Sequence, residues 1–271
     1  MKVKVIKKND LIGICANLLI ALEEHYFKKE GQILDFEFKN LIYTNDKCVW
    51  GKFFKRQTTY KNDNVEFFSY KPRKKFFFNY MGNKNKTKVL YNKILIKKIR
   101  SIFFKNIEFV KEIYTKAALF AKKKISKKTL SVHLRGTDRF HVHAKGKRNL
   151  FNFEKDILPK IIYEKKKRFC DKIYLVTDEY FFIKKMYKHF KKDLILPYSK
   201  IIDKNNNSNA VVNLINSERI KTRLGEEALI ECLIMSKCKF NLLSKSNMGL
   251  TAILLRNDMN YKFIDENIFH K

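Results

Sequence analysis

The chain contains little proline, glycine or cysteine: 3, 8 and 5 residues, respectively, among 271. With so few turn-forming residues, no Pro/Gly/Ser-rich linker separates the chain into halves. The five cysteines include no CxxC pair, and an odd number without metal-ligand spacing favours reduced thiols in a cytosolic compartment. No run of 18 apolar residues occurs, so we expect no membrane-spanning segment.

The first residues share some features with a signal peptide, because several lysines precede an apolar stretch from Leu11 to Leu22. However, Asn9 and Asp10 interrupt this pattern, and Asn17 lies inside the apolar stretch. No small-residue cleavage site follows. We therefore expect no signal peptide and a cytoplasmic protein.

Acidic residues are also scarce, since 27 Asp and Glu stand against 59 Lys and Arg, for a formal net charge of +32. Only ten of the basic residues are arginine. One interpretation is a solvated lysine coat without function, because Lys, Asn, Ile and Phe are all residues of AT-rich codons. The other is attraction to an anionic partner: a nucleic acid, a phospholipid surface or a phosphorylated substrate. Readers of nucleic acid favour arginine for bidentate contacts, so we expect no specific nucleic acid partner.

The N-terminal part of the chain has the pattern of a βαβ unit. A strand is predicted over Val3–Ile6, a helix over Asn17–Lys29 and a second strand over Ile33–Phe38. Helical spacing is then present from Asn92 to Lys124. The chain is 45% apolar and long enough for one large or two small domains, and we assign residues 1–127 to the first domain.

From residue 128, short apolar runs alternate with helical patterns, as in consecutive βαβ units. Strands are predicted over 130–134, 173–176, 194–196 and 240–243, and helices over 153–169, 180–190, 224–237 and 248–255. This alternation predicts a second domain, residues 128–271, with a mostly parallel sheet covered on both faces. The expected fold class is therefore α/β, with two Rossmann-like domains.

Polar groups follow three of the predicted strands, and in open α/β sheets ligands bind outside the carboxyl ends of the strands. Arg135 can hold two phosphate oxygens through its planar guanidinium. The hydroxyls and backbone N–H groups of Ser244–Asn247 suit an anion at the positive end of the helix that follows. The carboxylate of Asp178 or Glu231 can accept paired hydrogen bonds from the edge of a guanine. Together these groups suit a guanosine diphosphate.

Each of these groups also has an ordinary structural explanation. Arg135 could form a salt bridge with Asp138. The pairs Ser246–Asn247 and Asp178–Glu179 are typical of helix caps. His133 lies inside a predicted strand and fits a hydrogen-bonded core histidine equally well. Spacing alone leaves these alternatives open.

The segment Ser131–Asp138 (SVHLRGTD) resembles the V-H-x-R-x-T-D segment of the α1,6-fucosyltransferases and their bacterial nodulation relatives. The order of further segments agrees. A Y-L-x-T-D segment follows at Tyr174–Asp178, then a helix of the form A-L-I-x-x-x-L-x-S-x-C at Ala228–Cys238, a strand, and S-N before a final helix. The resemblance covers nearly all of residues 128–255 and is patchy before them, where Gly13–Leu18 (GICANL) resembles the family's glycine turn.

The resemblance implies a GT-B-like glycosyltransferase, in which two Rossmann-like domains with mostly parallel sheets face a cleft. The first domain would hold the acceptor and the second a GDP-sugar, typically GDP-fucose. Carried over residue by residue, Arg135 would contact the β-phosphate, and His133 and Glu231 would face the guanine. Ser246 falls in the loop that touches phosphate, and Asp138 would orient the arginine loop.

The chain departs from the family pattern near this loop. The α1,6 enzymes carry two consecutive arginines, and the second is Gly136 here. Their proposed base is a glutamate five residues after the aspartate of the T-D pair, a position that His143 occupies, with His141 nearby. Histidine can act as a general base at neutral pH, so the chemistry is retained while the acceptor is left open. Glu231 stands where these enzymes have the shorter aspartate.

No DxD triplet, the usual metal-binding motif of metal-dependent transferases, occurs in the sequence. A fixed cation, Arg135, would then neutralise the charge that develops on the departing GDP. We therefore expect a metal-independent, inverting transferase that uses a GDP-sugar on a glycan or lipid-linked acceptor of a bacterial surface polysaccharide or lipopolysaccharide. The alternatives are transfer of another GDP-deoxy-sugar or a heptose, or a basic α/β protein that binds nucleic acid.

A lipid-linked acceptor would place the protein on the inner face of the membrane, where each juxtamembrane lysine contributes about 1 kcal/mol of attraction. The segment Lys71–Phe78 (KPRKKFFF) mixes cations and aromatic residues and is the candidate membrane patch. A basic loop beside a core strand is the competing explanation.

Overall fold

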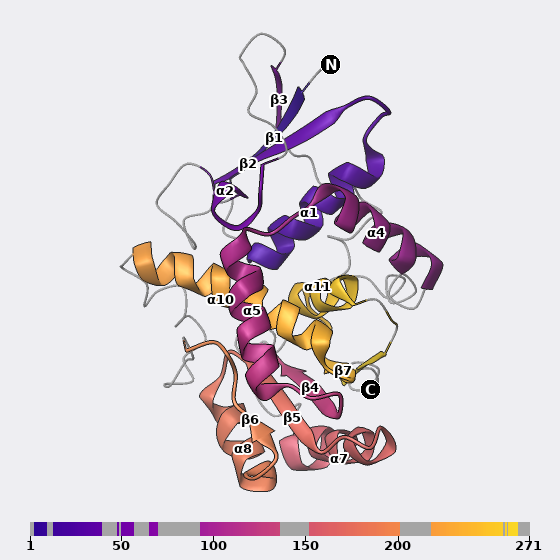
Figure 1. Cartoon of the computed structure of the whole chain (residues 1–271), viewed down its shortest axis with the longest axis vertical. Helices are drawn as coiled ribbons and strands as arrows, with labels where there is room; N and C mark the ends of the chain where they lie inside the picture. The colour runs from indigo at the N-terminus through magenta and orange to yellow at the C-terminus, as the bar shows by residue number, and fades with distance from the viewer. Residues whose placement is uncertain are drawn as a thin grey trace. The chain divides into compact units, whose positions relative to one another are not determined.

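The computed structural model describes residues 3–9, 13–39, 48, 50–56, 65–69, 93–135, 152–200, 218–256, 258 and 260–264. The chain forms two compact units (Figure 1). The first consists of Met1–Tyr114 with Ser217–Leu229, and the second of Thr115–Asn216 with Ile230–Lys271. The domain boundary after residue 127 stays a prediction.

The first unit contains a sheet of three parallel strands in the order β2-β1-β3. Its strands are β1 (Val3–Asn9), β2 (Ile33–Lys39) and β3 (Val65–Ser69). Helix α1 (Ile14–Phe27) connects β1 to β2, so the predicted βαβ unit is confirmed. The side chains of α1 are buried almost all round, as its apolar composition requires. The sequence patterns did not indicate β3, whose side chains are mostly exposed.

The helical spacing over residues 92–124 corresponds to two helices, and the sequence pattern did not indicate the break between them. They are α4 (Lys93–Asn106) and α5 (Lys111–Lys124), and a short strand-like segment separates them. In this segment Phe109 forms an antiparallel bridge with Phe54, and their rings lie 5.3 Å apart. Val110 donates a backbone hydrogen bond to the carbonyl of Phe53, at the end of the short helix α2 (Trp50–Phe53). Burial of Phe109 beside Phe54 therefore interrupts the helix.

The second unit contains five parallel strands in the order β6-β5-β4-β7-β8. The strands are β4 (Thr129–Leu134), β5 (Lys172–Thr177), β6 (Leu194–Ile195), β7 (Phe240–Leu243) and β8 (Tyr261–Phe263). The α-helices are α7 (Leu158–Lys167), α8 (Tyr180–Phe190), α10 (Glu218–Lys237) and α11 (Asn247–Leu255). One π-helical turn, η4 (Phe153–Ile157), comes directly before α7. The predicted α/β fold with parallel sheets in two units is confirmed, with β8 as an addition.

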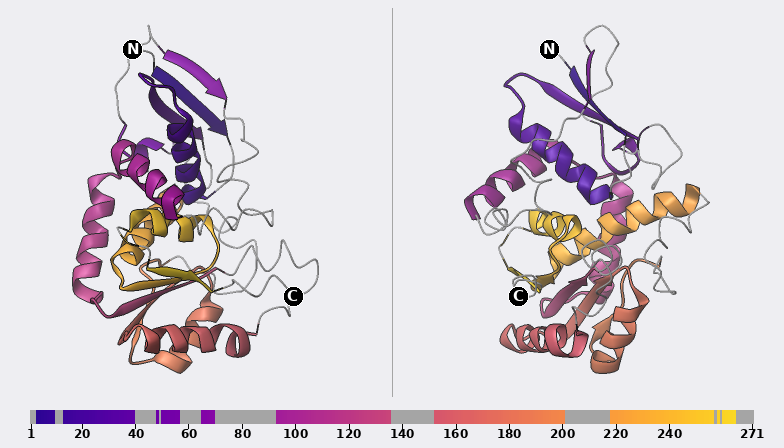
Figure 2. Two further views of the ribbon diagram at one scale, coloured as in Figure 1. Left: turned by 90° about the vertical axis from the view of Figure 1, so that its right-hand side faces the viewer. Right: turned by 180° about the vertical axis from the view of Figure 1, so that it is seen from behind.

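Helices cover both faces of the second sheet (Figure 2). On one face, Val132 of β4 and Leu175 of β5 pack in the same core as Ile161 of η4–α7 and Phe182 of α8. On the other face, the ring of Tyr174 lies 5.7 Å from that of Phe120 on α5. Alternate side chains of each buried strand therefore meet different helices, as expected for a parallel sheet.

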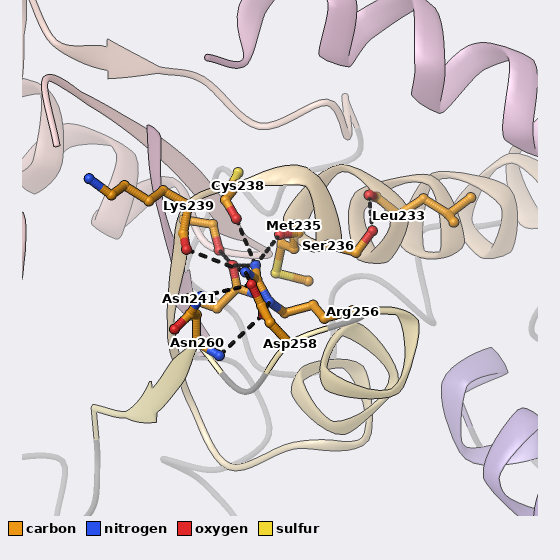
Figure 3. A network of polar contacts seen from close by, with 10 residues as sticks. Leu233, Met235, Ser236, Cys238, Lys239, Asn241, Arg256, Asp258 and Asn260 are labelled. Carbon is orange, nitrogen blue, oxygen red and sulfur yellow. Dashed lines mark hydrogen bonds and ion pairs between the residues drawn. The ribbon is translucent and has the colours of Figure 1, made fainter. Parts of the chain in front are cut away.

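A buried arginine joins α10, β7 and α11 on this second face (Figure 3). Arg256, which follows α11, is 3% exposed and forms an ion pair with Asp258, with Nε 2.7 Å from Oδ1. Its Nη1 donates to the carbonyl oxygens of Met235 and Cys238 and to Oδ1 of Asn241. The guanidinium thus satisfies carbonyls at the C-terminal end of α10, where a helix has unpaired acceptors and a negative partial charge.

Candidate functional site

The strand order of the second sheet creates a topological switch point between β4 and β7. From β4 the chain runs outward through β5 to β6, and it then returns to the other side of β4 to form β7 and β8. Connections diverge at such a point, and ligands of open α/β sheets bind outside the carboxyl ends of the strands there. The residues that follow β4 and β7 are Arg135 and Ser244.

Ser244 ties the ends of these two strands together. Its backbone N–H and its Oγ both donate to the carbonyl oxygen of His133, each at 3.0 Å. The Ser244 Oγ in turn accepts a hydrogen bond from the backbone N–H of Arg135 at 3.2 Å. The half-buried Arg135 therefore leaves β4 directly beside the loop that leads into α11.

Ser246 is the N-cap residue of α11, so the helix-cap interpretation of this serine is confirmed. Its Oγ accepts a hydrogen bond from the backbone N–H of Gly249 at 3.0 Å, and the residue is 1% exposed. A Cβ atom at Gly249 would lie 2.7 Å from the carbonyl oxygen of Ser244, so only glycine permits this close approach of helix and loop. Asn247 is the first residue of the helix, whose N-terminal N–H groups form a positive helix end.

Asp178 also follows a strand at this edge of the sheet. Thr177, the last residue of β5, is paired in register with Leu134, so Asp178 and Arg135 leave adjacent strands at the same level. The Thr177 Oγ1 accepts a hydrogen bond from the backbone N–H of Glu179, at the N-cap position of α8. The Glu179 side chain itself makes no capping hydrogen bond.

Glu231 lies on α10, beside the segment that follows β6. Its buried carboxylate accepts a hydrogen bond from the backbone N–H of Ser199 at 3.0 Å. Burial raises the pKa of the Tyr174 hydroxyl well above its usual value, and the nearby charge of Glu231 raises it further. This phenol therefore stays protonated and accepts a hydrogen bond from the backbone N–H of Tyr198.

Three further residues were predicted for the site: His133, Asp138 and His143. His133 lies within β4 and is 3% exposed, which fits a core histidine, and its contact with a guanine stays a prediction. Asp138 and His143 lie outside the described residues, as does the segment Lys71–Phe78. Within the described ranges, no group of three or more His, Cys, Asp and Glu side chains could hold a metal ion.

Sequence reasoning missed two buried polar residues. Arg256 was not predicted, although an arginine two residues before an aspartate at a helix end is a usable signal. Asn17, in the first turns of α1, is 1% exposed, and its amide atoms have no hydrogen-bond partner in the part of the chain that the structure describes. An asparagine within an apolar helix that follows a strand was the available signal.

None of the described helices combines the length and the apolar character needed to cross a membrane.

Comparison with models of protein families and with curated proteins gave no match. Comparison with solved structures matched NodZ alpha-1,6-fucosyltransferase along nearly the whole of both chains. Its structure co-crystallised with GDP has a TM-score of 0.57 at 13% identity, covering 94% of this chain and 93% of that one. The chain has the fold of this fucosyltransferase. The structure of fucosyltransferase NodZ from Bradyrhizobium has a TM-score of 0.56 at 14% identity and covers 94% of each chain. The structure of NodZ soaked with GDP-fucose has a TM-score of 0.55 at 15% identity and covers 94% of this chain and 93% of that one. The expected fold class is thereby confirmed at the level of the whole chain.

Proposed function

We propose that the protein is a glycosyltransferase that takes its sugar from a GDP-sugar, with GDP-fucose as the first candidate. One observation carries the proposal: on the fold of a fucosyltransferase that was crystallised with GDP, Arg135 leaves β4 hydrogen-bonded to Ser244, beside the capped N-terminus of α11. A cation and a positive helix end at one switch point suit a diphosphate. Another GDP-deoxy-sugar or a heptose is the alternative donor.

Arg135 would supply the fixed positive charge of the reaction. In the transfer, the bond between the anomeric carbon and the β-phosphate oxygen breaks, and its electron pair leaves with GDP. The Arg135 guanidinium can hold two oxygens of that diphosphate, while the N–H groups at the start of α11 face the same charge. Such preorganised donors stabilise a developing charge without a metal ion. We accordingly propose metal-independent transfer.

The acceptor hydroxyl attacks the anomeric carbon from the opposite side, so the configuration inverts. Its proton must pass to a base, and His143 is our candidate, with Asp138 orienting the loop that carries Arg135. Two carboxylates, Asp178 and Glu231, are the candidates for the N1–H and N2–H₂ groups of guanine. The contact of Ser199 with Glu231 supports this assignment, because it holds one carboxylate oxygen in place.

The acceptor we propose is a glycan or lipid-linked precursor of a bacterial surface polysaccharide or lipopolysaccharide. Such an acceptor would place the protein in the cytoplasm, peripherally on the inner face of the membrane. The net charge of +32 supports attraction to an anionic surface.

Arg135→Ala tests this proposal. We expect it to lower the rate of sugar transfer or of GDP-sugar hydrolysis by roughly 100-fold to 1,000-fold, because one preorganised cation is lost. Arg135→Lys should recover only part of this rate, since an ammonium cannot hold two oxygens at once. Calorimetry with GDP, with and without EDTA, measures binding directly.

Arg168→Ala is the matched control. Arg168 stacks on Phe240, the first residue of β7, at 4.2 Å. It therefore lies at the amino ends of the strands, whereas the proposed donor site is at their carboxyl ends. This variant should bind GDP like the unmodified protein. If the unmodified protein does not bind GDP, the proposal is refuted. If it binds GDP but loses this binding in EDTA, the proposed metal independence is refuted.

A further inference from the structure

Helices α7 and α8 lie side by side over one face of the second sheet, as both views show (Figure 1 and Figure 2). Glu154, in the turn before α7, joins them through an ion pair with Lys185 at 3.0 Å and a contact with Nε2 of His189 at 2.8 Å. Ile161 of α7 and Met186 of α8 are fully buried against the sheet. The opposite sides of both helices therefore face away from the sheet.

These outward sides combine lysines with half-exposed aromatic rings. On α7, the Lys167 ammonium lies 5.2 Å from the ring centre of Tyr163 and donates to its hydroxyl at 3.1 Å. On α8, Lys184 lies 4.9 Å from the ring of Tyr180, and Lys191 lies 5.8 Å from that of Tyr187. Aromatic and basic residues thus alternate along one stripe of each helix.

Within the two helices, every exposed charged residue is basic. Helix α8 contains no acidic residue, and the one acid of α7, Glu164, is buried and paired with Arg168 at 3.4 Å. Asp193, which follows α8, is held by Lys165 at 3.0 Å. We call the exposed residues Tyr163, Lys166, Phe169, Lys184, Tyr187 and Lys188 the α7–α8 surface.

Phe169 is the most unusual residue of this surface. It is 80% exposed, and its φ of 51° places it in the left-handed region that glycine prefers. The ring contributes almost no packing to the fold, and the backbone conformation is unfavourable for a side chain. A contact outside the protein would account for an apolar ring in this position.

A shallow apolar pocket adjoins the same surface at Tyr163. It has a volume of about 240 Å³ and is lined by Pro159, Leu242 and Phe263, with Lys160, Lys262 and the buried Glu164 also on its walls. Lys262 pairs with Glu164 at 3.4 Å, so the two lysines leave the walls with a net positive charge. An apolar hollow of this kind suits a hydrocarbon segment beneath an anionic headgroup.

We infer that the α7–α8 surface docks on an anionic lipid bilayer. Lysines attract anionic headgroups, and exposed tyrosine and phenylalanine rings insert at the boundary between headgroups and acyl chains. A nucleic acid is disfavoured because the cations are lysines on the outward sides of two helices, rather than arginines along a groove. The inference concerns a surface apart from the proposed donor site and does not depend on the transferase activity.

Sedimentation of the full-length protein with lipid vesicles tests the inference. We expect binding to vesicles of equal parts phosphatidylglycerol and phosphatidylcholine, and little binding to phosphatidylcholine alone. The triple variant Lys166→Gln, Lys184→Gln, Lys188→Gln should bind roughly 100-fold more weakly, since each lysine contributes a factor of about five. Phe169→Ser should weaken the part of the binding that persists at high salt.

The matched control removes the same charge elsewhere. Lys122, Lys123 and Lys124 are exposed at the end of α5, and their replacement by glutamine should weaken binding far less than the α7–α8 triple variant does. Equal losses in the two triple variants, or no binding to anionic vesicles, would overturn the inference. The inference would also be overturned if the protein bound single-stranded DNA more tightly than anionic vesicles and lost that binding in the α7–α8 triple variant. Unchanged melting temperatures and GDP binding separate these outcomes from misfolding and from failure of the proposed function.

Discussion

At the scale of single residues, Phe169 shows how backbone geometry and surface chemistry conflict. The end of α7 is closed by two backbone hydrogen bonds, from Phe169 to the carbonyl of Lys166 and from Cys170 to that of Lys165. This pair of bonds defines a Schellman motif, in which the residue at the position of Phe169 must be left-handed. Glycine is the usual residue there because it lacks a Cβ atom.

We therefore expect Phe169→Gly to stabilise the protein. The relief of left-handed strain outweighs the extra flexibility of glycine in the unfolded chain, for a net gain of about 1 kcal/mol. Urea-induced unfolding measures the change. Phe169→Ala, which keeps a Cβ atom in the same conformation, should gain much less, and a glycine variant no more stable than the alanine variant would contradict the explanation.

At the scale of secondary-structure elements, the N-terminus of α11 combines a structural and a proposed functional role. Ser246 caps the helix, so Ser246→Ala should cost about 1 kcal/mol of stability in urea unfolding. Ser246→Asp retains a capping oxygen and should retain the stability. Its negative charge would face the diphosphate, however, and we expect GDP affinity to fall more than tenfold.

The contrast between these two variants distinguishes the roles of the serine. If Ser246→Asp binds GDP as tightly as the unmodified protein, the helix end is not a phosphate site. Calorimetry on both variants decides this, with unfolding measurements on the same samples as the control for the cap.

Prediction of the elements succeeded where the pattern was local and strong. The bounds of α8 and β7 agree with the predicted bounds to the residue. Helical spacing and short apolar runs can be recognised from neighbouring residues in the sequence alone. The three-residue strand β8 was missed, since its sequence, Tyr-Lys-Phe, is not a continuous apolar run like that of the short strand β6. The break between α4 and α5 was missed because it depends on Phe54, which is distant in sequence.

At the scale of the whole molecule, charge of one sign dominates. A net charge of +32 makes the compact state repel itself, and surface ion pairs such as that of Lys7 with Glu37 offset only part of this repulsion. We expect the melting temperature to rise with added NaCl, because the screening length falls from roughly 30 Å at 0.01 M to about 10 Å at 0.1 M.

KCl at equal ionic strength serves as the comparison, since screening depends on charge and not on the identity of the ion. A melting temperature that stays constant or falls with either salt would show that the lysines are arranged without net repulsion.

The amino-acid sequence was sufficient for the α/β class and for most strands and helices, since periodicity and caps arise between near neighbours in the chain. It also placed Arg135, Asp178 and Ser244 after strands. Their arrangement required the folded sheet, because the order β6-β5-β4-β7-β8 and the hydrogen bond between Arg135 and Ser244, 109 residues apart, depend on long-range packing. The outward stripes of α7 and α8 likewise emerge only when both helices bury their other sides on one sheet.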